Sequence, residues 1–173
     1  MLAASGATLA VGAPVALAAC GTDEEEDEVT PEREAELLNA ILAQQLAVTN
    51  AIAAAIGGNT PGALRRPLGE LIDAREASGQ ALEQEISKLG GTAVDEAAEL
   101  VGGESPTEGV ARQLEAAIAA SLDAIGELSP EQRQPVHDAI VEDAAALAAL
   151  RLVLGEEPAP DAFVMGPPTE AVQ

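Results

Sequence analysis

The chain has 173 residues, with 30 Asp and Glu against 8 Lys and Arg, a formal net charge of −22, one Cys, one His and one aromatic side chain, a Phe. The length suits a single domain, one cysteine excludes an internal disulfide, and one histidine excludes a multi-histidine or Cys/His zinc site. The acidic excess repels phosphate backbones. With a single Phe there is also almost no aromatic surface for bases to stack on, so the composition predicts no nucleic-acid partner.

The N-terminal segment is a long uncharged run that ends at the single cysteine. Residues 1–19 carry no charge, are mostly Ala, Val, Leu and Gly, and lead into Leu17-Ala18-Ala19-Cys20-Gly21. This ending resembles a lipobox, where small residues fit the signal peptidase and the cysteine thiol is acylated. We predict a signal peptide over 1–19, a membrane anchor on Cys20, and export to the outer face of the cytoplasmic membrane in the cell envelope. A transmembrane helix is the alternative, but the run contains Gly12 and Pro14 and has no basic flank.

A basic stretch normally precedes the apolar run of such a signal, and here Leu2 follows Met1 directly. We expect the true start to lie upstream, where Arg residues, including a twin-Arg pair, would supply the charge. Sequencing the 5′ end of the transcript tests this expectation.

Two further segments flank the predicted domain. Asp23 to Glu28 are six consecutive carboxylates, which repel one another and stay solvated, so we predict a spacer over residues 20–31. A loose acidic run lacks the preorganised oxygen cage of a calcium site. Residues 156–173 are rich in proline and predict an irregular tail.

Four helices are predicted between these ends, within residues 32–155. Alanine is abundant and no stretch alternates with the period of a strand, which indicates an all-α class. Capping residues, glycines and prolines set the bounds: about Glu32 to Ile56, Thr60-Pro61 to Leu89, Ser105-Pro106 or Thr107 to near Leu128, and Ser129-Pro130 to Leu154. The first and last connections are short, whereas the segment from Gly90 to Pro106 can run the length of a bundle. This connectivity predicts a ferritin-like antiparallel four-helix bundle with a long crossover between helices two and three.

Each predicted helix has one polar residue at the middle of its apolar stripe. On helical wheels these are Gln45, Arg75, Ser121 and Asp143. Because an unpaired charge in a core costs several kcal/mol, we expect Arg75 and Asp143 to pair, with Gln45 and Ser121 completing the hydrogen bonds. The alternative is that some of these side chains reach the surface through a loosely packed, alanine-rich bundle. The pair could equally form the polar floor of a small pocket.

The last predicted helix and its exit, from Asp143 to Phe163, resemble the corresponding part of actinobacterial ferritin-like lipoproteins, as does Leu89-Gly90-Gly91. Ferritin-like metal enzymes place a Glu on each of two helices and Glu-x-x-His on each of the other two. Here Gln45 stands at the first Glu position, Glu76 is followed by Gly79 where His is expected, and Asp143 is followed by Ala146. The resemblance thus leaves Glu76, Glu115 and Asp143 as remnant metal ligands.

These departures predict that the di-metal site is lost. The guanidinium of Arg75 would repel a divalent metal and occupy the carboxylates. We therefore expect no cofactor and no enzymatic activity, and a binding or structural role with an envelope protein as partner. The alternative is a residual iron- or manganese-binding protein or oxidoreductase that uses the remnant ligands. A third hypothesis is that the acidic surface itself recruits a basic partner.

Overall fold

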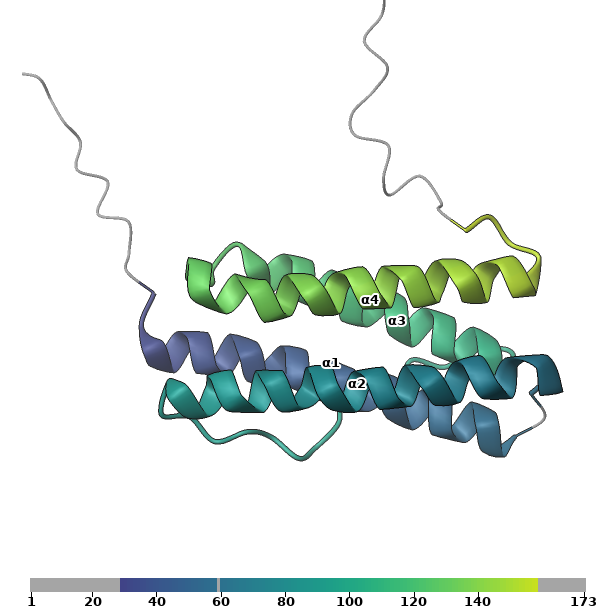
Figure 1. The fold of residues 1–173 in the computed structure, drawn as a ribbon, viewed down its shortest axis with the longest axis horizontal. Coiled ribbons are helices and arrows are strands. Elements are labelled where there is room, and N and C mark those ends of the chain that lie inside the picture. Colours follow the sequence, from purple (N-terminus) through teal and green to yellow (C-terminus); the bar gives the residue numbers. More distant parts are fainter. Residues whose placement is uncertain (1–28, 59, 159–173) are drawn as a thin grey trace, which may run out of the picture.

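The computed structural model describes residues 29–58 and 60–158 (Figure 1). The predicted signal peptide, Cys20, the acidic run and most of the predicted tail lie outside the described residues. The four helices are α1 (Pro31–Gly57), α2 (Gly62–Lys88), α3 (Pro106–Ile125) and α4 (Pro130–Leu154). The predicted all-α four-helix bundle is therefore confirmed.

The helix ends follow local chemistry. The side-chain oxygens of Thr30 and Ser105 accept hydrogen bonds from the first turns of α1 and α3, with a proline at the next position. α4 ends at Gly155, whose φ of 76° lies in the left-handed region that suits glycine. The third helix was predicted to end near Leu128, and α3 ends three residues earlier, at Ile125, with Gly126 as its cap. Leu128 nevertheless lies in the core, only 1% exposed.

Residues 89–105 form the predicted crossover between α2 and α3, which returns along α1 (Figure 1). The side chain of Asn39 on α1 donates to the carbonyl of Thr92 and accepts from the backbone N–H of Val94. Further along, the N–H of Ala98 donates to the carbonyl of Ala43 at 2.9 Å. These bonds hold the crossover against α1, so α3 begins at the end of the bundle where α2 also begins.

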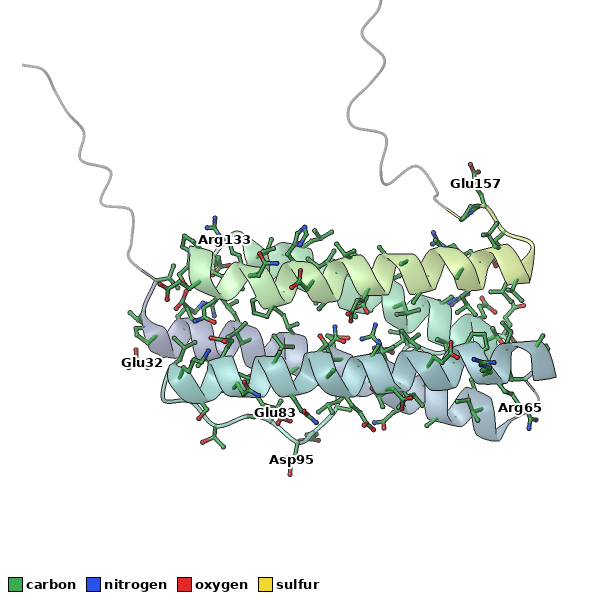
Figure 2. The ribbon with its side chains drawn as sticks, in the orientation of Figure 1. Glu32, Arg65, Glu83, Asp95, Arg133 and Glu157 are labelled. Carbon is green, nitrogen blue, oxygen red and sulfur yellow. The ribbon has the colours of Figure 1, made fainter. Side chains whose placement is uncertain are left out.

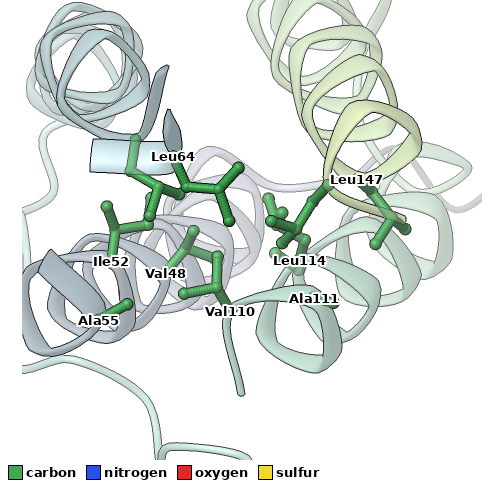
Figure 3. Packing of buried hydrophobic residues seen from close by; sticks show 11 residues of the cluster. Val48, Ile52, Ala55, Leu64, Val110, Ala111, Leu114 and Leu147 are labelled. Carbon is green, nitrogen blue, oxygen red and sulfur yellow. The ribbon is translucent and has the colours of Figure 1, made fainter. Parts of the chain in front are cut away.

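The core is divided into two halves along the bundle axis. We call the first the closed half; it fills the end where α1 begins and comprises Leu38, Ile41, Leu42, Leu82, Ile86, Ala124, Leu128 and Val136. The second, the open half, fills the end where α2 begins and α4 ends (Figure 3) and comprises Val48, Ile52, Ala55, Leu64, Leu68, Val110, Ala111, Leu114, Ala117, Leu147 and Leu150. In Figure 3, Leu64 of α2 and Leu147 of α4 lie apart, with Leu114 of α3 between them.

Helix α1 contributes to both halves of the core. By length and composition alone it is apolar enough to cross a membrane. Its residues Leu38, Val48 and Ile52 are fully buried within the bundle, whereas Ala53 and Ala54 are exposed. An apolar stripe that faces the core raises the hydropathy of a bundle helix in the same way.

Candidate functional site: a buried polar layer

A layer of polar side chains separates the two halves of the core. Gln45, Arg75, Ser121 and Asp143 come from α1, α2, α3 and α4 respectively, and each is 3% exposed or less. On each helix, the polar residue lies between the core residues of the closed half and the core residues of the open half. The helical period therefore turns all four side chains into the bundle at the level where the halves meet.

Three of these side chains contact one another. The guanidinium of Arg75 forms an ion pair through Nη2 with Oδ1 of Asp143, and its Nη1 donates a hydrogen bond to Oε1 of Gln45. The amide Nε2 of Gln45 donates to Oδ2 of Asp143 at 3.2 Å. The three contacts form a closed triangle, so both carboxylate oxygens of Asp143 have a partner.

Burial dominates the electrostatics of the layer. It lowers the pKa of Arg75 to about 10, against the opposing influence of the nearby Glu142 carboxylate. A pKa of about 10 still leaves the guanidinium charged at neutral pH. The buried cation therefore needs its anionic partner, because an isolated charge in a core costs several kcal/mol.

Ser121 does not complete the hydrogen bonding as we expected. Its Oγ is buried but has no hydrogen-bond partner among the described residues, and the Nε of Arg75 has none either. Helix α2, which carries Arg75, lies diagonally across the bundle from α3, and the nearer Gln45 and Asp143 contact each other and Arg75. The short side chain of Ser121 does not span that diagonal.

The structure does not bring the three remnant ligands together. Asp143 is buried, but Glu76 is exposed, because its neighbour Arg75 takes the core-facing position on α2. Glu115 is also exposed and pairs with Arg151 of α4 at the bundle surface. Within residues 29–58 and 60–158, no group of three or more His, Cys, Asp or Glu side chains could hold a metal ion.

Two buried side chains with structural roles were missed by the sequence analysis. Gln113, fully buried, accepts a hydrogen bond from the N–H of Val101 at 2.7 Å and so fixes the end of the crossover. Glu34 accepts from the N–H of Ser129 at 2.6 Å, where α4 begins. The only sequence signal was a polar residue at the border of an apolar stripe, and that pattern occurs equally on exposed helix faces.

Comparison with protein-family models gives no match, and neither does comparison with curated protein sequences. Among solved structures, the chain is similar to a ferritin-like, diiron-carboxylate protein from Bacillus anthracis strain Ames. The TM-score is 0.65 at 16% sequence identity, and the alignment covers 72% of this chain and 96% of that protein. The chain therefore has a ferritin-like fold.

The polar layer does not fit the di-metal centre of such proteins. A di-metal centre needs several carboxylates and imidazoles that project inward from all four helices. The layer offers one carboxylate, an amide, a hydroxyl and a guanidinium, and the guanidinium already pairs with the carboxylate. A cation at that position opposes a second one by repulsion and competes for the same oxygens.

Proposed function

We propose that this chain is an exported, lipid-anchored envelope protein whose ferritin-like bundle has exchanged metal chemistry for a non-catalytic binding or structural role. The observation that supports it best is the ion pair of Arg75 with Asp143 at mid-height in the bundle. Arg75 supplies the positive charge that a metal would supply, and it does so without an open coordination position. The guanidinium of Arg75 thereby takes the place of a metal in linking α2 to Asp143 of α4 and to Gln45 of α1.

The proposed location has its own support in the sequence. The apolar segment before Cys20 and the six carboxylates from Asp23 to Glu28 are arranged as a signal, an acylation site and a spacer. A chain of this kind would hold the bundle off the membrane surface, because the carboxylates repel each other and favour an extended segment. The bundle would then face partners in the envelope.

The absence of a metal-binding role is tested by metal content. The 173-residue chain with Cys20→Ser, which blocks acylation, is incubated with iron or manganese, desalted and measured by mass spectrometry. We expect no retained metal, both in this chain and in a variant that also carries Asp143→Asn. Near-stoichiometric metal that is lost on Asp143→Asn but kept on Asp138→Asn, an exposed residue of the same helix, would overturn the proposal and favour the iron- or manganese-binding alternative.

The anchor is tested separately in a bacterial host fed an alkyne-labelled fatty acid. We expect the label in the membrane fraction of the wild-type chain and its complete loss on Cys20→Ser. Label retained in the Cys20→Ser variant would refute acylation at this residue.

A further inference from the structure

An apolar groove of about 520 Å³ runs between α2 and α4 over the open half of the core. Its floor contains the buried leucines Leu64, Leu68, Leu114 and Leu150. Its walls come from small side chains of both helices, among them Ala63 and Ala74 on α2 and Ala145 and Ala149 on α4. The groove begins at the end of the bundle where α2 starts and α4 ends (Figure 1), and its inner end lies beside the polar layer, at Ala74 and Glu142.

The groove exists because α4 presents alanines where a closed bundle would present larger side chains. Alanine cannot reach across to α2, so the leucines behind it remain slightly exposed. From Ala144 to Leu154 the only polar residue of α4 is Arg151. A helix that is apolar on nearly all sides is normally covered on all sides, yet Val153, at the rim of the groove, is 57% exposed.

We propose that this groove binds an amphipathic helix of another polypeptide, with an apolar face and basic residues along its edges. The inference deepens the proposed binding role and rests on it. Helix-in-groove recognition of this kind places apolar anchors at successive turns into a cleft between two helices. The groove runs along α4 from Glu142 to Val153, about 17 Å or three helical turns, which matches such a segment.

Charge selects the class of partner. The lining of the groove contains two carboxylates, Glu70 and Glu142, and no basic side chain. Glu142 forms no ion pair among the described residues, whereas Glu70 pairs with Arg66 at 2.8 Å. The chain as a whole carries −22, so it attracts a cationic partner and repels a second copy of itself, which brings only 8 basic residues against 30 acidic ones.

The probe is a synthetic helix with leucines on one face, lysines at the edges and a single tryptophan on the apolar face. The chain has no Trp or Tyr, so all the fluorescence excited in the tryptophan band comes from the probe. With the 173-residue chain carrying Cys20→Ser, we expect saturable binding with a blue shift of the emission. A probe with glutamates in place of lysines should not bind.

Matched variants separate the groove from general charge attraction. Ala149→Lys places a long cation in the groove, and Ala119→Lys places the same charge on the exposed face of α3. We expect Ala149→Lys to weaken binding at least tenfold, about 1.4 kcal/mol or more, and Ala119→Lys to change it less than about twofold. Glu142→Gln should weaken binding by about threefold, and Glu83→Gln, at the surface of α2 (Figure 2), by less.

Three outcomes would overturn the inference. Equal weakening by the two lysine variants would mean non-specific attraction to an acidic protein. A wild-type dimer in sedimentation that Ala149→Lys dissociates would mean that a second copy fills the groove. Binding only after removal of residues 159–173 would mean that the C-terminal segment fills it. None of these variants alters Arg75 or Asp143. The result of the metal measurement, which tests the proposed function, is therefore independent of the result of the binding measurement, which tests the groove.

Discussion

The two halves of the core differ in how completely the apolar residues of α2 and α4 are buried. In the closed half, Leu82 and Ile86 of α2 and Val136 of α4 are fully buried within one cluster. In the open half, the leucines of the two helices at the floor of the groove, Leu64, Leu68 and Leu150, are 4–6% exposed. Small side chains of both helices, among them Ala74 of α2 and Ala149 of α4, line the groove in the open half. A bundle can thus bury one half of its core fully and leave a groove over the other.

The polar layer between the halves should give the largest effect. Asp143→Ala leaves the guanidinium of Arg75 buried without its counter-charge, and we expect a loss of about 3–5 kcal/mol in the free energy of unfolding. Urea unfolding followed by circular dichroism measures it. As the control, Glu127→Ala removes the exposed pair with Arg33 and should cost less than about 1 kcal/mol. Equal losses in the two variants would contradict the buried ion pair.

Truncation of one leucine in each half tests the comparison directly. Leu82→Ala, on α2 in the closed half, creates an enclosed cavity, so we expect a loss of about 3–5 kcal/mol. Leu64→Ala, on the same helix in the open half, merely enlarges a groove, so the loss should lie nearer about 2–3 kcal/mol. Urea midpoints of the two variants measure the difference. If Leu64→Ala costs as much as Leu82→Ala, the open half is as tightly packed as the closed one.

Enlargement of one alanine of α4 on either side of the polar layer should change stability in opposite directions. Ala139 is 1% exposed, so Ala139→Leu overpacks the core and should cost about 1–3 kcal/mol. Ala146 lines the groove, so Ala146→Leu buries new apolar surface and should gain about 1 kcal/mol. Thermal unfolding of the two variants compares them, and a lower melting temperature for Ala146→Leu would argue against an unfilled groove.

The smallest effect concerns Glu108 at the start of α3. The backbone N–H of Glu104 and, less strongly, the guanidinium of Arg112 hold the pKa of this carboxyl below its usual 4.5. The folded state therefore binds this proton less readily than the unfolded state, so the contribution to stability is present above pH 4.5 and is lost as the pH falls through the folded pKa. The melting temperature is measured from about pH 6 down to about pH 3, the range in which carboxyl groups titrate. It should fall less steeply with decreasing pH in Glu108→Gln than in the wild-type chain.

Part of the site could be predicted because the helical period is local. The spacing of apolar residues turns Gln45, Arg75 and Asp143 inward at one level, and three contacts now join them. The exposure of Glu76 could not be predicted from the motif. Arg75 and Glu76 are adjacent on α2, so only one of them can face the core, and the motif match does not say which one. The partner of Glu115 was equally hidden, since Arg151 lies 36 positions away along the chain.

By itself the sequence determined the all-α class, the four helices and the long crossover. Caps, glycines and prolines act within a few residues, so their effects are legible before any folding is considered. Only the tertiary structure decided that α2 and α3 face each other across a diagonal and that the Oγ of Ser121 has no hydrogen-bond partner among the described residues. It alone also decided that the alanines of α4 leave a groove against α2, because the width of a gap depends on how helices distant in sequence pack around all their other contacts.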